Sequence, residues 1–161
     1  MATYKIGNRK NTYTPGEENA TYILDKGKLV ETVTPGILQA EGLEGLSFQI
    51  GGKIKSIDDA IRIGDTLSPA SDLSIEIAKS GRLVSKTGNG IDLKATDLEV
   101  ENHGIVRGVS GIRVVSADGF VENDGAVIGS GAGIVASGKV AVRNEGTIKG
   151  DQYGLVFNAT D

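Results

Sequence analysis

The hydrophobic positions of this chain recur at a fixed interval and alternate with polar positions inside each repeat. The pattern is clearest in VENHGIVRG (100–108), VENDGAVIG (121–129) and VRNEGTIKG (142–150), each of which begins 21 residues after the one before. Each segment reads apolar-x-Asn-x-Gly-x-apolar, and a Gly-apolar pair follows it a few residues later. Short alternating segments without a helical period predict short β-strands.

Weaker copies of the repeat extend toward the N-terminus. If the central glycine is taken as the anchor of each copy, the anchors are Gly27, Gly52, Gly81, Gly104, Gly125 and Gly146. Successive anchors lie 25, 29, 23, 21 and 21 residues apart. The longer intervals contain loop sequences at 40–45 and 65–72.

This alignment produces three columns in which every residue is apolar. Four residues before the anchor stand Ile23, Phe48, Ile77, Val100, Val121 and Val142. Two residues after it stand Leu29, Ile54, Leu83, Val106, Val127 and Ile148. In the second half stand Ile37, Ile61, Ile91, Ile112, Ile134 and Leu155. One coil cannot bury its apolar side alone, whereas stacked coils bury continuous columns and pair their strands in parallel.

The repeat therefore predicts an all-β fold, a right-handed parallel β-helix of about six coils of 21–29 residues. Residues 1–22 lack the repeat, and we expect them to form an N-terminal capping segment over a repeat domain at 23–161. The sequence at 158–161 has no capping signature. We therefore expect an open end there, which further chain or an oligomeric partner would cover.

Composition narrows the possible functions. The net charge is −4, aromatic residues make up 4% of the chain, and cysteine is absent. No nucleic-acid partner is expected, because such binders are usually basic or use aromatic platforms. Disulfides, zinc–thiolate sites and cysteine nucleophiles are excluded. No apolar run reaches transmembrane length, and the start, MATYKIGNRKN, has no signal-peptide core.

The motif N-x-G-x-[IV]-x-G followed by G-[IL] resembles the repeats of bacterial β-helix passengers. These include autotransporters, filamentous-haemagglutinin-like adhesins and type I-secreted repeat proteins. The resemblance covers 77–157 well and 23–61 weakly, and it implies an extracellular or cell-surface location. Type I-secreted proteins usually carry a calcium nonapeptide with an aspartate, which GSGAGIVAS (129–137) lacks. We therefore expect no cofactor, with Ca²⁺ as an alternative that no motif supports.

Asn102, Asn123 and Asn144 are spaced one coil apart, which predicts a ladder at a turn. The glycine two residues after each asparagine would then supply an unusual backbone angle. The alternative is a polar binding stripe. Beside the ladder, the outward carboxylates are weak candidates for a shared Ca²⁺: Glu101, Glu122, Asp124 and Glu145. A solvated charged face is the competing interpretation, and His103, the single histidine, is expected in a turn.

Two outward columns flank the apolar column that follows the anchors. One position after the anchor come Lys28, Lys53, Arg82, Ile105, Ala126 and Thr147. Three positions after it come Val30, Lys55, Val84, Arg107, Ile128 and Lys149. The candidate binding face therefore carries Lys28, Lys53, Lys55, Arg82, Arg107 and Lys149, interleaved with exposed apolar residues. Such a face fits an acidic polysaccharide, a host or cell surface, or packing on another chain. The alternative is an ordinary solvated face whose lysines limit aggregation.

These patterns favour a structural or adhesive module of an exported bacterial protein, without covalent chemistry. The first alternative is a carbohydrate-active β-helix that binds or cleaves an acidic polysaccharide, as a lyase or epimerase. Asp58 and Asp59 are the nearest paired acids, but neighbouring strand residues point opposite ways, and no catalytic residue is assigned. The second alternative is a segment of a phage tail fibre.

Overall fold

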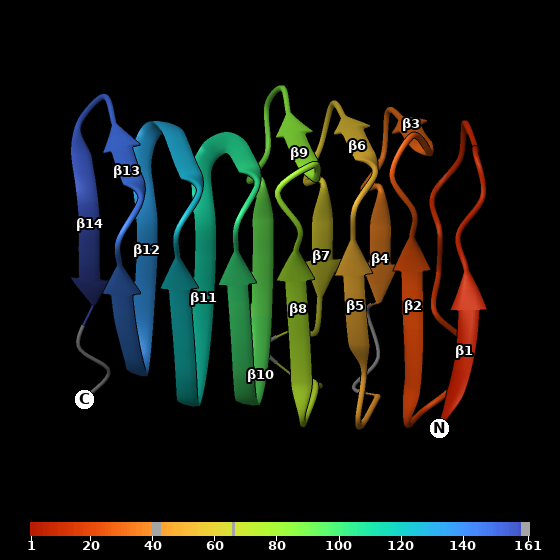
Figure 1. Cartoon of the computed structure of the whole chain (residues 1–161). Coiled ribbons are helices and arrows are strands. Elements are labelled where there is room, and N and C mark those ends of the chain that lie inside the picture. Colours follow the sequence, from red (N-terminus) through yellow and green to blue (C-terminus); the bar gives the residue numbers. More distant parts are fainter. Residues whose placement is uncertain (40–42, 66, 159–161) are drawn as a thin grey trace.

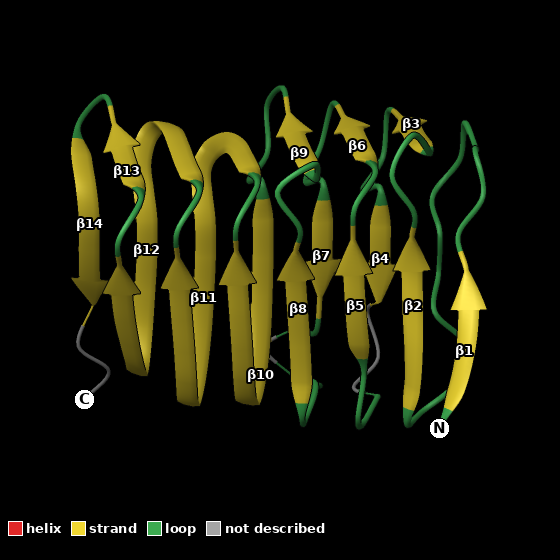
Figure 2. Cartoon of the chain, viewed as in Figure 1, coloured by secondary structure: helices red, strands yellow, loops and turns green. Residues whose placement is uncertain are grey.

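The computed structural model describes residues 1–39, 43–65 and 67–158, which form strands and turns and no helix (Figure 2). Parts of the two predicted loops, at 40–42 and 66, and the end of the chain at 159–161 lie outside the described residues. The strands are β1 (Ala2–Lys5), β2 (Ala20–Leu24), β3 (Leu29–Thr32), β4 (Ile37–Gln39), β5 (Ser47–Ile50), β6 (Lys53–Ser56), β7 (Ile61–Ile63), β8 (Leu73–Ile77), β9 (Arg82–Ser85), β10 (Ile91–Asn102), β11 (Ile105–Asn123), β12 (Ala126–Asn144), β13 (Thr147–Gly150) and β14 (Tyr153–Asn158).

The chain is a right-handed parallel β-helix, as the repeat predicts (Figure 1). It has about seven turns, where the repeat predicts about six coils. Every strand pairs in parallel with its counterpart in the next coil. Sheet 1 contains β1, β2, β5, β8 and the C-terminal parts of β10, β11 and β12. Sheet 2 contains β3, β6, β9, the N-terminal parts of β11 and β12, and β13. Sheet 3 contains β4, β7, β14 and the remaining parts of β10, β11 and β12.

The core consists of columns of stacked side chains that run along the axis of the helix. In sheet 3 the predicted column from Ile37 to Leu155 is in register throughout, and its first five members are fully buried. In sheet 1, Val100 stacks on Val121, and Val121 on Val142. The long strands β10 to β12 pass from one sheet to the next without a break, since the coil bends where glycine or a small residue lies.

The predicted columns are wrong at three positions near the N-terminus. In sheet 1 the column runs through Tyr22 and Ile75 rather than Ile23 and Ile77. In sheet 2 the buried residue is Val30, while Leu29 lies in the outward column above Lys53. The cause is the corner between sheets 1 and 2, which has two residues in most coils but four at 25–28 and 78–81. Counting from a glycine anchor, back to Ile23 and Ile77 or forward to Leu29, therefore reaches a different strand position in those coils.

The glycines of this corner are required by close packing. An added Cβ at Gly125 would collide with the carbonyl oxygen of Gly104, and one at Gly146 would collide with that of Gly125. These three glycines do not have positive φ, in contrast to Gly27, whose φ is 84°. The expected unusual backbone angle is therefore absent at the Asn-x-Gly corners. Glycine is needed there because stacked coils bring one backbone against the next.

The predicted cap, residues 1–22, lies across the first repeat and itself follows the path of a coil. Strand β1 pairs with β2, Arg9 bridges to Val30 in sheet 2, and Tyr13 bridges to Ile37 in sheet 3. Aromatic side chains close this end: Tyr22 stacks on Tyr4 and on Phe48, with ring centroids 5.3 and 5.4 Å apart. Tyr13 meets the Tyr22 ring edge-on at 5.7 Å.

The opposite end of the described solenoid exposes residues that belong to core columns. Leu155 and Phe157 are 40% and 59% exposed, whereas Ile134 and Ala136, one coil earlier in the same columns, are buried. That further chain or a partner covers this surface stays a prediction.

Candidate functional site

The outer face of sheet 2 carries most of the basic side chains that the sequence singles out. Lys53 and Arg82 follow Leu29 in one outward column. Lys55, Arg107 and Lys149 stand in the other, where Val84 and Ile128 lie between them and Glu31 precedes Lys55. Two residues that were predicted in these outward columns lie elsewhere. Lys28 is exposed but lies at the corner before β3, outside the columns, and Val30 points into the core.

At the N-terminal half of this face the surface forms an open groove of about 550 Å³, which we call the basic groove. Four lysines line it: Lys10, Lys53, Lys55 and Lys86. Three aliphatic side chains lie among them, Val33, Ile57 and Val84, and the first two are 69% and 43% exposed. The groove thus combines positive charge with apolar surface in contact with water.

The register of the coils explains why these residues meet. Ile57 N–H donates to the carbonyl of Thr32 and Lys86 N–H donates to that of Ser56, so Val33, Ile57 and Lys86 form one line along the helix axis. The second line contains Lys10, Glu31, Lys55 and Val84, because Glu31 N–H donates to Arg9 and β6 pairs with both β3 and β9. Successive members of each line are separated by about 4.8 Å, the spacing of neighbouring strands.

The charges and hydroxyls of the groove have different partners. Lys55 forms an ion pair with Glu31 at 3.4 Å. Within the part of the chain that the structure describes, Lys10, Lys53 and Lys86 have no ion-pair partner. The hydroxyls have partners within the protein, since Ser56 Oγ donates to the Thr34 carbonyl at 2.5 Å and Thr32 Oγ1 shares a 2.9 Å bond with Thr34 Oγ1.

Among the lysines and aliphatic residues of the groove, sequence reasoning missed four: Lys10, Val33, Ile57 and Lys86. Lys10 lies in the predicted cap, and the other three follow the last residue of β3, β6 or β9. The alignment on glycine anchors ended at the third position after each anchor, whereas the groove lies across the next corner. The signal available was the recurrence of an apolar or long side chain directly after each short strand.

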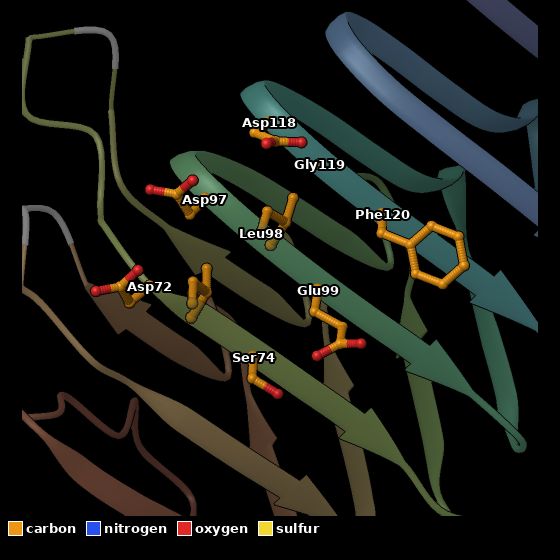
Figure 3. A pocket seen from close by; sticks show the side chains of 9 residues that line it. Asp72, Ser74, Asp97, Leu98, Glu99, Asp118, Gly119 and Phe120 are labelled. Atoms are coloured by element: carbon orange, nitrogen blue, oxygen red, sulfur yellow. The ribbon is translucent and has the colours of Figure 1, made fainter.

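Sheet 1 has an acidic outer face, of which the sequence predicted Glu101 and Glu122 as outward carboxylates but not the aspartates. Asp72, Asp97 and Asp118 precede successive strand segments and lie one coil apart beside a hollow of about 320 Å³ (Figure 3). Glu99 and Phe120 also line it and are neighbours in the same outward column. The charge of the molecule is therefore divided between faces, acidic over the middle of sheet 1 and basic over sheet 2.

The carboxylates predicted as weak metal candidates lie beside different side chains, Arg143 and His103, and do not converge on one point. Glu101 stacks on Glu122, and Glu122 is 3.4 Å from Arg143, which also pairs with Glu145. His103 is 3.2 Å from Asp124 and 3.9 Å from Glu101. Over residues 1–39, 43–65 and 67–158, no group of three or more His, Asp or Glu side chains is placed to hold a metal ion.

The asparagines form a ladder inside the helix at the corner between sheets 1 and 2. Asn102 Nδ2 donates to Asn123 Oδ1, and Asn123 Nδ2 donates to Asn144 Oδ1, each at 2.6 Å. Asn102 and Asn123 are fully buried, and Asn102 Oδ1 accepts the N–H of Gly104 at 3.1 Å. Asn102 and Asn123 therefore lie within the core and offer no stripe to a ligand, whereas Asn144 is exposed and donates to the carbonyl of Gly146 at 3.1 Å.

The paired acids meet at the next corner around one arginine. Arg62 donates to Asp59 at 2.6 Å and to Asp58 at 3.0 Å, and neither aspartate belongs to a strand. The expectation that they point opposite ways is therefore wrong. The side chain of Asp59 is 2% exposed and also accepts the N–H of Asn89 at 2.5 Å. Burial raises its pKa above the ordinary value, and the two hydrogen bonds oppose that rise only in part.

Comparison of the chain with protein-family models, curated proteins and solved structures finds no match. The described residues also contain no helix that is long and apolar enough to cross a membrane. Interpretation of the site therefore rests on the geometry of the chain itself.

Proposed function

We propose that this chain is an adhesive module of an exported bacterial surface or extracellular protein, and that it works by rigid display of the outer face of sheet 2. The observation that carries this proposal is the continuity of that face. Basic side chains recur from Lys53 in β6 to Lys149 in β13, and half-buried apolar side chains lie between them. A mixed basic and apolar face of this kind is typical of an interaction surface.

The scaffold supports display because the face stands on a continuous core. Each outward side chain on sheet 2 alternates with an inward one, and Ile54, Leu83, Val106 and Val127 beneath it are fully buried. Parallel pairing holds neighbouring coils together over the length of the face. A ligand that spans several coils would therefore meet side chains whose spacing is already set, which lowers the entropy cost of binding.

The local pairing of charges favours binding over chemistry. In the described residues, the most buried acid, Asp59, is held by Arg62 away from the basic groove, and Glu31 in the groove is held by Lys55. A lyase or epimerase needs an acid and a base that converge on one substrate position. The groove supplies several ammonium groups and one carboxylate that is already paired.

The test is attachment of beads coated with the purified domain to a layer of cultured epithelial cells. We expect the wild-type domain to bind, and a variant with Lys53→Gln, Arg82→Gln and Arg107→Gln to lose at least fivefold of the attached beads. The matched control changes three exposed lysines on other surfaces, Lys26→Gln, Lys79→Gln and Lys139→Gln. Attachment of this control within twofold of wild type is expected.

Two results would overturn the proposal. Wild-type beads that attach no better than albumin-coated beads would remove the adhesive function. Release of unsaturated uronides from polygalacturonate by the purified domain would establish a lyase in its place.

A further inference from the structure

We infer that the basic groove binds an extended acidic peptide that carries aliphatic side chains; the inference rests on the proposed adhesive function and names the chemistry of its partner. The groove is open and is lined by side chains from successive coils, which stand in register along the helix axis. Lys10, Glu31, Lys55 and Val84 come from four successive coils, which are separated by three strand spacings of about 4.8 Å each. This length matches four to five residues of an extended peptide at about 3.3 Å each.

The positive charge of the lysines in the groove favours an acidic ligand. Lys10, Lys53 and Lys86 lie around the groove without an ion pair among the described residues, while the whole chain has a net charge of −4. Carboxylates elsewhere on the molecule, above all on sheet 1, repel an acidic partner. Attraction is therefore strongest at sheet 2, where several basic side chains gather, and this orients the partner as it approaches.

The apolar side chains select a ligand with aliphatic groups. Val33 and Ile57 stand one coil apart in one line, and Val84 stands in the neighbouring line. Two of them are among the most exposed large hydrophobic residues of the described chain. Covering them with valine, leucine or isoleucine side chains removes apolar surface from water on both partners, at about 25 cal/mol per Å².

The same groove is poorly suited to a polysaccharide. Sugar recognition requires donors and acceptors for the ring hydroxyls and usually a flat aromatic surface. None of the residues that line the groove is aromatic. The hydroxyls of Thr32 and Ser56 are already bonded to Thr34. The remaining polar groups are charged, so they recognise carboxylates through their charge and do not read hydroxyl positions.

The experiment measures binding of fluorescein-labelled EVEVEV by fluorescence polarisation, with QVQVQV and ESESES as matched probes. The first control lacks charge and the second lacks aliphatic groups. We expect EVEVEV to bind at least tenfold more tightly than either control and to weaken as the salt concentration rises. Equal binding of EVEVEV and ESESES would show that the apolar side chains take no part and would overturn the inference.

Variants separate the two contributions. Lys53→Gln with Lys86→Gln should weaken EVEVEV at least fivefold and reduce the salt dependence. Ile57→Ser should weaken it at least threefold and leave the salt dependence unchanged. Lys139→Gln, on the corner before sheet 1, serves as the control and should bind within twofold of wild type. Thermal melting of each variant checks the fold, and the exposure of Ile57 makes that change tolerable.

Competition separates this inference from the proposed function. If EVEVEV displaces domain-coated beads from cells, both hold. If beads attach through sheet 2 but polygalacturonate displaces them and EVEVEV neither binds nor competes, the adhesive function stands and the peptide inference is wrong. If beads fail to attach, the adhesive function fails whatever the peptide does.

Discussion

The side-chain amide of Asn102 donates a 2.6 Å hydrogen bond to Oδ1 of Asn123 inside the core, one coil away. In earlier coils the same column contains aliphatic residues, Leu24, Ile50 and Ile77. A buried amide is stable there only because its neighbour and the local backbone satisfy it. The ladder is therefore a chain of dependent bonds, and its members should not contribute independently to stability.

Replacement of Asn123 by leucine should destabilise the protein although leucine suits the column. The change leaves Asn102 Nδ2 buried without its acceptor, which costs about 1–3 kcal/mol. The double variant Asn102→Leu with Asn123→Leu removes the donor as well. The unfolding free energy that the double variant loses, measured by urea unfolding, should be smaller than the sum of the losses of the two single variants. Losses that add within about 0.5 kcal/mol would show that the two amides are not coupled.

The sequence was sufficient to predict the fold because the repeat imposes one consistent pattern. Where the corner has two residues, as after Val100 and Val121, the predicted register is correct. Where the corner has four, as at 25–28, it failed, because corner length does not alter the hydrophobic period of the strands. Backbone conformation at a corner depends on the distance to the next coil, which no single repeat encodes.

Much less of the candidate site could be predicted. Lys53 and Lys55 were found because they stand on a strand at a fixed distance from a glycine. Lys10 and Ile57 meet across coils through a corner and a segment outside the repeat, so their proximity depends on stacking. The division of charge between sheets 1 and 2 likewise follows from the register of several coils.

Gly125→Ala should destabilise the protein by about 1–3 kcal/mol, because the added methyl group would overpack the corner against Gly104. Gly131→Ala is the matched control, since its nearest neighbour would be the Val109 carbonyl oxygen at 3.4 Å, an ordinary contact. Urea unfolding of both variants checks the difference. Equal stability of the two would mean that neighbouring coils separate easily at the Asn-x-Gly corner.

Val127→Asp should unfold the domain, because Val127 is fully buried in the sheet 2 column between Val106 and Ile148. An unpaired carboxylate there has no partner and loses its hydration. Ile128→Asp, one residue later, places the same charge on the outer face and should keep the fold. Circular dichroism melting compares them, and similar melting of both would contradict the register of β12.

The carboxyl group of Asp59 should make the protein less stable as the pH rises through the acidic range. Burial raises its folded-state pKa above the ordinary value of 3.8, so the folded protein holds this proton more tightly than the unfolded chain does. The stabilisation that this proton provides is complete below the unfolded-state pKa and is lost as the pH rises through the raised folded-state pKa.

Asp59→Asn removes this titration while its Oδ1 can still accept the N–H of Asn89. The unfolding free energy of wild type minus that of the variant, measured by urea unfolding from pH 3 to pH 7, should therefore fall with rising pH. A difference that rises with pH would show that the hydrogen bonds from Arg62 and Asn89 outweigh burial and hold the pKa of Asp59 below its ordinary value.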